Sequence, residues 1–332
     1  MEHQRQILRL GALLIALAAA IRLVSAGFFT PILSVLGQEK VAALLMYLET
    51  GRVVRFVRPQ SMQQPEATEP SSPEETAPPE QPEMELPVFA PQELSLFEVQ
   101  YQCDYRPGLE ELLTQPLIWD LTGPAPTVLI VHTHATETYT GEDIEYSGTY
   151  RSLQAQHNML SIGDEIARVL EQGGIRVLHD RTLHDYPDYN SSYGAARSTI
   201  EAYLKANPSI QMVLDIHRDA SDSTAGQLIT SATAGGQKSA QLMMVVGTDA
   251  GGNYHPHWQE NLSLALKLTA RLEQNDPGIS RPVALRSERF NMDLTTGSLL
   301  VEVGAAGNTH KEALIAANAL AQSILELAHG TR

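Results

Sequence analysis

The residues whose types could do chemistry follow a short apolar segment near the middle of the chain. Residues 127–131 are β-branched or apolar and carry no charge, which predicts a buried strand. His132, His134 and Glu137 come soon after this segment. Imidazole nitrogens and carboxylate oxygens are ligands that zinc takes in proteins. A strand followed by this set of residues is therefore a candidate metal site.

Two later predicted strands end in a similar way. Residues 213–216 lead into His217 and Arg218, and residues 298–301 lead into Glu302. In an open α/β sheet, ligands bind in the crevice outside the carboxyl ends of the strands. We therefore expect the three strand ends to converge on one crevice.

The histidines also have a simpler interpretation as structural residues. The chain contains 11 histidines, and a given histidine is more often a hydrogen-bonded structural residue than a metal ligand. No His-Glu-x-x-His pair occurs, so a site would need ligands as far apart in the chain as His134 and His217. Their position at strand ends favours the metal site.

The elements that must position these residues alternate along the chain from Pro124 onward. Strand, helix and strand in succession predict an α/β fold, with a mostly parallel twisted sheet and helices on both faces. Besides the first strand, we expect strands over residues 175–178, 210–216, 241–246, 282–286 and 298–303, and helices over residues 158–172, 194–206, 258–274 and 311–328. We expect the strand 241–246 to pair at a sheet edge with residues 227–231.

Three further expectations concern the surroundings of the crevice. The helix 158–172 has one apolar face, formed by Met159, Ile162, Ile166, Val169 and Leu170. The long polar loop 179–193 is either a candidate substrate wall or a surface loop, and we favour the wall. Residues 254–258 are expected to form a second rim.

Composition separates this domain, residues 124–332, from what precedes it. Residues 59–93 contain eight glutamates and nine prolines but no Lys or Arg, which indicates a disordered spacer. Residues 94–123 form a transitional segment that we expect to pack on the domain edge. The formal net charge of −16 argues against nucleic acid as a partner. With Cys103 as the single cysteine, the chain can form no intrachain disulfide.

The amino-terminal part predicts a single-pass membrane anchor. Residues 7–36 are the longest apolar stretch and are long enough to cross a bilayer. Arg5 and Arg9 at its start favour a cytoplasmic tail, with the carboxyl-terminal domain outside the cell membrane. A cleaved signal peptide is the alternative. An uncleaved anchor, residues 1–36, is favoured because the apolar character continues to Leu36; residues 37–58 then form an amphipathic juxtamembrane segment.

Several long sequence blocks carry a family resemblance. These blocks are HTHATETY, HDRTLHDYPDYNSSY, LDIHRDA, LMMVVGTDAGGNYHPHWQENL and LLVEVGAAGNT. Together they resemble the stage II sporulation protein P (SpoIIP) family, over about residues 124–327. That family is similar to the zinc-dependent N-acetylmuramoyl-L-alanine amidases, which implies an amidase-like fold and a Zn²⁺ cofactor.

The resemblance also implies roles for individual residues. It makes His134 and His217 zinc ligands and Glu302 the general acid/base. The amidases carry a third ligand, a glutamate, at the start of the first helix, where this chain has His157 and Asn158 instead. Glu137 is the substitute we favour, with Glu142, Glu145 and His157 as alternatives. Arg218 could pair with a carboxylate of the substrate, or with Asp215 or Asp219 as a structural residue.

The function implied by the resemblance is hydrolysis of peptidoglycan in the septal wall during sporulation and engulfment. The bond cleaved would be the amide between N-acetylmuramic acid and the stem peptide, with stem-peptide cross-links as a further target. Partners would be proteins of the engulfment machinery. Two rivals stay open, a catalytically degenerate scaffold that binds peptidoglycan and recruits hydrolases, and a zinc carboxypeptidase-like peptidase.

Overall fold

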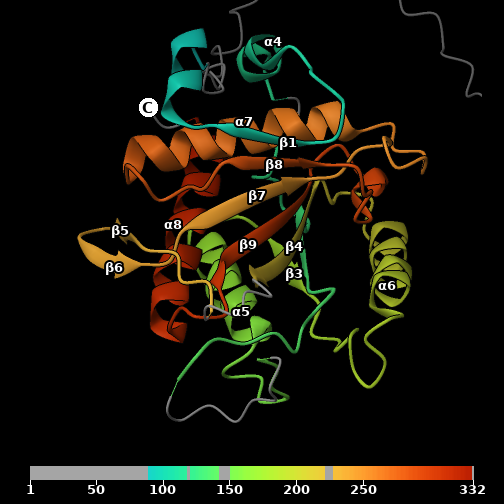
Figure 1. Cartoon of the computed structure of the whole chain (residues 1–332). Coiled ribbons are helices and arrows are strands. Elements are labelled where there is room, and N and C mark those ends of the chain that lie inside the picture. The colour runs from blue at the N-terminus through green and yellow to red at the C-terminus, as the bar shows by residue number, and fades with distance from the viewer. Residues whose placement is uncertain (1–88, 118–119, 142–149, 221–226, 331–332) are drawn as a thin grey trace, which may run out of the picture. The chain divides into compact units, whose positions relative to one another are not determined.

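The computed structural model of the chain describes residues 89–117, 120–141, 150–220 and 227–330 (Figure 1). In chain order the elements are η1 (Pro91–Leu96), β1 (Val99–Gln102), α4 (Leu109–Thr114), β2 (Val128–Val131), α5 (Met159–Gln172), β3 (Val177–His179), α6 (Ser192–Ala206), β4 (Met212–Asp219), β5 (Ala232–Ala234), β6 (Gln237–Ser239), β7 (Leu242–Val246), α7 (Trp258–Asn275), β8 (Val283–Arg286), η2 (Met292–Leu294), β9 (Ser298–Ala305) and α8 (His310–His329).

The expected anchor, the juxtamembrane segment and residues 59–88 of the spacer lie outside the described residues. Among the helices that the structure does describe, none is both long enough and apolar enough to cross a bilayer.

Seven strands form one sheet in the order β1-β8-β7-β9-β4-β2-β3. The pairs among β3, β2, β4 and β9 are parallel, as are those among β7, β8 and β1. The two groups meet at β7 and β9, which pair antiparallel. The sheet is therefore mostly parallel, as predicted, but its two groups of strands point to opposite edges.

The direction of β7 corrects two expectations. We expected this strand to pair at an edge with residues 227–231, but it lies inside the sheet between β8 and β9, and residues 227–231 form no strand. Because β7 runs opposite to β9, the segment after it, including residues 254–258, begins at the other edge of the sheet. These residues were expected to form a second rim of the crevice, and the strand direction puts them elsewhere.

Alternation of side chains along the strands divides the core into two layers. On one face Val128 and Ile130 of β2 join a large cluster with α5, α7 and α8. On the other face Leu129 and Val131 pack with Ile200 of α6. The helices therefore cover both faces, with α6 on the opposite side from α5 and α8 (Figure 1).

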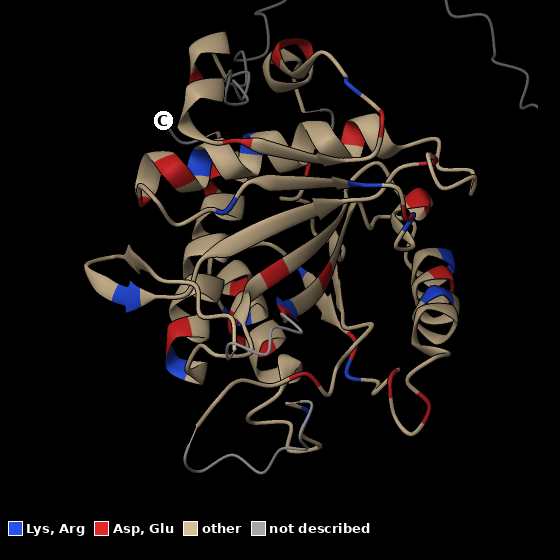
Figure 2. Ribbon diagram, viewed as in Figure 1, with Lys and Arg blue, Asp and Glu red and all other residues tan. Residues whose placement is uncertain are grey.

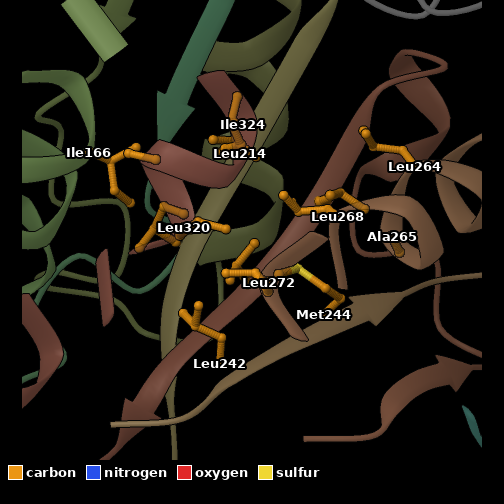
Figure 3. Close-up of a cluster of buried hydrophobic side chains, with 14 of the residues drawn as sticks. Ile166, Leu214, Leu242, Met244, Leu264, Ala265, Leu268, Leu272, Leu320 and Ile324 are labelled. Atoms are coloured by element: carbon orange, nitrogen blue, oxygen red, sulfur yellow. The ribbon is translucent and has the colours of Figure 1, made fainter. Parts of the chain in front are cut away.

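The larger cluster confirms the predicted apolar face of the first long helix. All five positions expected to face inward are buried, and these are Met159, Ile162, Ile166, Val169 and Leu170. Figure 3 shows Ile166 among side chains from β4, β7, α7 and α8. Burial of each such side chain stabilises the fold by about 1.5–3 kcal/mol, which holds the sheet rigid beneath the site.

The segment before Pro124 belongs to the sheet. Phe89 is already buried in the core, and η1 begins at Pro91, within the residues expected to be spacer. β1 pairs with β8 as the edge strand. The α/β domain therefore includes residues well before the change of sequence texture at Pro124.

Candidate functional site

Three adjacent parallel strands bring the predicted site residues to one edge of the sheet. β4 lies between β2 and β9, Val131 is in register with Asp215, and His217 is in register with Glu302. Both β4 and β9 carry acidic residues within the strand (Figure 2). β4 continues to Asp219 and β9 to Ala305, so His217 and Glu302 lie inside paired strands rather than just beyond them.

His134 lies in a turn directly after β2. The backbone N–H of Glu137 donates to the His134 carbonyl oxygen at 3.1 Å, which closes the turn. The imidazole is buried, and its Nδ1 atom has no hydrogen-bond partner. Burial, followed by the neighbouring His217, lowers the pKa of His134 to about 4. The ring is therefore neutral near pH 7, as a metal ligand must be.

His217 faces His134 edge to face, with ring centroids 5.3 Å apart. Its Nε2 atom lies 2.9 Å from Asp215 Oδ1, close enough for an ion pair, although it makes no hydrogen bond within the described structure. Burial alone would lower the pKa of His217, but the Asp215 carboxylate outweighs this effect and raises the pKa to about 9. Asp215 is itself fixed by the Thr133 backbone N–H at 2.8 Å and hydroxyl at 2.6 Å.

Glu137 lies on the other side of His217. Its Oε2 atom is 3.7 Å from His217 Nδ1, and the carboxylate is buried. The Arg218 backbone N–H donates to the same Oε2 at 3.3 Å, and Arg218 Nη1 lies 3.6 Å from Oε1. Glu137 is thus held next to His217 by a buried cation.

Arg218 is buried and turned into the protein. Its Nε atom donates to the Thr138 carbonyl oxygen at 3.0 Å, and its Nη2 atom donates to that of Tyr150 at 2.9 Å. The two aspartates considered from the sequence have other partners, since Asp215 faces His217 and Asp219 pairs with Arg281 at 2.7 Å. The structure therefore ties Arg218 to Glu137 and to nearby backbone.

Glu302 presents an unpartnered carboxylate oxygen to the same edge. Its Oε2 atom is buried and makes no hydrogen bond. Burial raises the pKa of Glu302 to about 8, a rise that His217 opposes and Glu137 reinforces. A carboxyl group with this pKa can both accept and donate a proton near neutral pH.

The alternatives to Glu137 fare differently. Glu142 and Glu145 lie outside the described residues. The ring of His157 lies 6.0 Å from that of His310 on α8. Asn158 stands where the amidases have a helix-opening glutamate, and it caps α5 by accepting from the Leu160 backbone N–H at 3.1 Å. The helix start here therefore has a structural residue.

Tyr189 from the polar loop after β3 and Tyr193 from the first turn of α6 complete the surroundings of His134. The Tyr189 ring stacks on the imidazole with centroids 4.5 Å apart, and Tyr193 meets it edge to face at 5.5 Å. The sequence marked residues 179–193 as a candidate substrate wall, but no local pattern indicated which tyrosine would touch His134. The Asp215–His217 pair was also missed, although residues two apart on a strand share a face.

The histidines and glutamate fit zinc in the chemistry of their donor atoms. Ligands of one tetrahedral zinc lie roughly 3.3 Å apart, since each bond is about 2.0–2.1 Å, and the His217–Glu137 separation is close to that. His134 Nδ1, buried and unpartnered, is a further candidate donor. Over the part of the chain that the structure describes, however, no group of three or more His, Cys, Asp or Glu side chains is arranged to hold a metal ion.

Solved structures similar to this chain include two cell-wall amidases. One is the N-acetylmuramoyl-L-alanine amidase AmiC2 of Nostoc punctiforme, with a TM-score of 0.39, 15% identity, and coverage of 61% of this chain and 98% of that one. Another is an N-acetylmuramoyl-L-alanine amidase from Clostridium difficile 630, with a TM-score of 0.37, 16% identity, and coverage of 61% and 97%. Both TM-scores are below 0.5, so we base no argument on these likenesses.

Sequence comparison is more specific. The chain is 29% identical over 217 residues to the stage II sporulation protein P of Bacillus subtilis (strain 168). The match covers 62% of this chain but only 52% of that protein, so the chain spans about half the length of this curated relative. Residues 47–325, well over half of the chain, match the sequence model of the same family. The chain therefore belongs to the stage II sporulation protein P (SpoIIP) family.

Proposed function

We propose that this protein is a zinc-dependent peptidoglycan hydrolase that cleaves the amide between N-acetylmuramic acid and the stem peptide. The observation that carries the proposal is the convergence of His134, His217, Glu137 and Glu302 on one sheet edge, with buried atoms of His134 and Glu302 left unpartnered. Native proteins rarely leave buried polar atoms without partners, so such a group points to a ligand. Family membership supports a role in remodelling the septal wall during sporulation.

Zinc would be held by His134, His217 and Glu137, and His217 would lose a proton when zinc binds. When bound, it supplies a Lewis acid that polarises the amide carbonyl and lowers the pKa of a water molecule. Asp215 contributes by fixing the ring orientation of His217 through the 2.9 Å contact at Nε2, which leaves Nδ1 facing Glu137. Arg218 holds Glu137 in place through its backbone and guanidinium contacts. We therefore assign Arg218 a positioning role rather than direct contact with substrate.

Glu302 moves the protons in this proposal. Its free Oε2 atom accepts a proton from the attacking water, and the same oxygen later donates a proton to the leaving amide nitrogen. The pKa of about 8 makes both transfers accessible near neutral pH. The same proton transfers would serve for cleavage of stem-peptide cross-links, which are also amides.

The setting of the enzyme is a proposal from sequence. Residues 7–36 would anchor the chain in the cell membrane, and residues 59–88 would hold the domain away from it on the outer side. Proteins of the engulfment machinery would be its partners.

Zinc content of the full-length chain tests the proposal. Wild type should hold about one zinc per chain, and His134→Ala, Glu137→Ala and His217→Ala should each lower zinc affinity strongly. His157→Ala is the matched control, and its zinc content should be unchanged. No zinc in the wild type under metal-replete conditions would contradict the mechanism.

Product analysis then separates the activities. Muramic acid freed of its peptide indicates the amidase, whereas split cross-links with intact muramoyl amides indicate a peptidase. A wild-type chain that binds peptidoglycan but releases neither product would support the scaffold alternative.

A further inference from the structure

A hollow lies beside the candidate site. It has a volume of about 310 Å³ and is lined by residues that include Thr136, Arg151, Leu153, Asp185, Tyr186 and Tyr189. Tyr189 also stacks on His134, with ring centroids 4.5 Å apart. A ligand in this hollow would therefore be separated from the His134 imidazole by the Tyr189 ring.

The walls of the hollow are apolar and open to solvent. Six large hydrophobic side chains are exposed among the described residues, and three of them, Leu153, Tyr186 and Tyr189, line this one hollow. Their exposed fractions are 54%, 55% and 44%. Clustered exposed aromatic faces indicate a binding surface rather than chance exposure.

The charged groups of the hollow balance each other. The Arg151 guanidinium lies 3.8 Å from the centre of the Tyr189 ring, and its Nη1 atom is 3.6 Å from Asp185 Oδ2. Asp185 is buried and accepts the Thr136 hydroxyl at 2.6 Å and backbone N–H at 3.2 Å. Because the cation is already paired with a fixed anion, a neutral ligand suits the hollow better than an anionic one.

These features point to a ligand that is neutral, has an apolar face and carries hydroxyl or amide groups at its edge. A sugar ring has this character. Its C–H face can lie against a tyrosine ring, and its edge groups can bond to the Arg151 guanidinium, whose side chain is 24% exposed. The volume, at the small end of the usual range of ligand pockets, suits about one such ring.

We propose that this hollow is a glycan subsite, which binds one N-acetylated sugar ring of peptidoglycan next to the scissile amide. The inference rests on the proposed function, since it places the glycan side of the substrate against Tyr186 and Tyr189. It makes Tyr186 a specificity residue that does not touch the reacting atoms.

Binding of two separate halves of the substrate tests the subsite. The full-length Glu302→Gln variant is titrated with a soluble, uncharged oligomer of N-acetylglucosamine, and separately with a free stem peptide. Adding Tyr186→Ala should weaken glycan binding by about 3- to 10-fold, because an aromatic contact of this kind is lost, and should leave peptide binding unchanged. Adding Tyr254→Ala is the matched control, because Tyr254 is 77% exposed and follows the oppositely directed strand β7.

Equal glycan affinity in the Tyr186→Ala and Tyr254→Ala backgrounds would overturn the subsite. So would Arg151→Gln if it weakened peptide binding while glycan binding held, because the hollow would then recognise a carboxylate. Thermal melts of each variant check that the fold is intact.

The outcome for the subsite is separable from that for the proposed function. Glycan binding that depends on Tyr186 in a chain that releases no product retains the subsite and removes the amidase. Release of product with an unchanged KM in Tyr186→Ala, in a chain with Glu302 intact, retains the amidase and removes the subsite.

Discussion

Two pairs of histidines begin at the end of β2, and they differ in their surroundings rather than in their ring geometry. His132 meets His179 with ring centroids 5.1 Å apart at 70°, and His134 meets His217 at 5.3 Å and 85°. His132 and His134 are two residues apart in sequence. Nothing in the ring geometry separates the two pairs.

The His132 pair is closed by hydrogen bonds. His132 Nδ1 lies 3.0 Å from the Ile216 carbonyl oxygen and must donate to it, so its Nε2 accepts from His179 Nε2 at 2.8 Å. His179 Nδ1 in turn lies 3.1 Å from Asp164 Oδ1, so the His179 ring makes both contacts as a donor only when it carries two protons. Every ring nitrogen of this pair has a partner inside the protein.

The His134 pair is open by comparison. His134 Nδ1 has no partner, and His217 Nδ1 is 3.7 Å from Glu137, beyond hydrogen-bond distance. The two pairs are therefore distinguished by whether their ring nitrogens have hydrogen-bond partners, and not by the distance between the rings. The pair with partners is structural, and the other is available for a ligand.

The largest expected effect is on hydrolysis of peptidoglycan. If zinc is held as we propose, His134→Ala should lower the rate by at least ~10³-fold, because the variant would lose a metal ligand and with it several kcal/mol of transition-state stabilisation. His179→Asn should stay within about 3-fold of wild type, because that pair is structural. Rates measured on folded samples of both variants would contradict the comparison if the two losses were equal.

A smaller effect is expected on the free energy of unfolding when an added methyl group is placed against the His132–His179 pair. A Cβ added at Gly163 would lie 2.5 Å from His179 Nε2 and 2.6 Å from His132 Nε2. Gly163→Ala should therefore destabilise the protein by about 1–3 kcal/mol, as overpacking does. Gly194→Ala is the control, because Gly194 lies in α6 with nothing within 4 Å of the added carbon.

Urea titration of the two glycine variants reads out this difference. The control should raise the free energy of unfolding by about 0.5–1 kcal/mol, since alanine favours the helix. Unchanged stability in Gly163→Ala would show that the closed pair tolerates displacement.

Two buried groups should make the stability of the metal-free chain depend on pH, with opposite signs for His132 and Glu302. Burial, reinforced by His179, lowers the pKa of His132 to about 3, so its contribution is full above about pH 6.5 and is lost as pH falls toward 3. Burial raises the pKa of Glu302 to about 8, so its protonated folded form favours folding below about pH 4.5, and this contribution is lost as pH rises toward 8.

Free energies of unfolding measured from pH 4 to 8 check these signs. His132→Phe should reduce the slope of the free energy of unfolding against pH on the acid side, and Glu302→Gln should reduce it on the alkaline side. Each reduction should correspond to roughly one bound proton. A steeper alkaline loss in Glu302→Gln would reverse the sign assigned to this carboxyl group.

The sequence was sufficient to predict the alternating elements and the meeting of three strand ends. Continuous apolar strands such as Val128–Val131 and the amphipathic α5 have patterns that depend on local residues only. The convergence of β2, β4 and β9 at one edge followed from the general rule that parallel strands present their carboxyl ends together, whereas their adjacency in the sheet was not predicted.

What the sequence could not supply depends on partners far along the chain. The residue pattern of β7 does not indicate the direction of the strand, so its antiparallel pairing with β9 could not be predicted from the sequence. The polar strand Val99–Gln102 has no strong apolar signal, because it lies at the sheet edge. The partners of Arg218 and the closed state of His132 likewise come from residues on other elements.

The polar loop between β3 and α6 exposes Tyr186 and Tyr189 but is fastened at several points. His184 contacts the His132 carbonyl oxygen and the Thr199 hydroxyl, each at 2.9 Å, while Asp185 accepts from Thr136. Fixing backbone costs about 1–2 kcal/mol per residue in conformational entropy, and here that cost is incurred when the chain folds. A ligand that reaches the tyrosines therefore meets a prearranged wall, and its association rate should be set by encounter rather than by loop ordering.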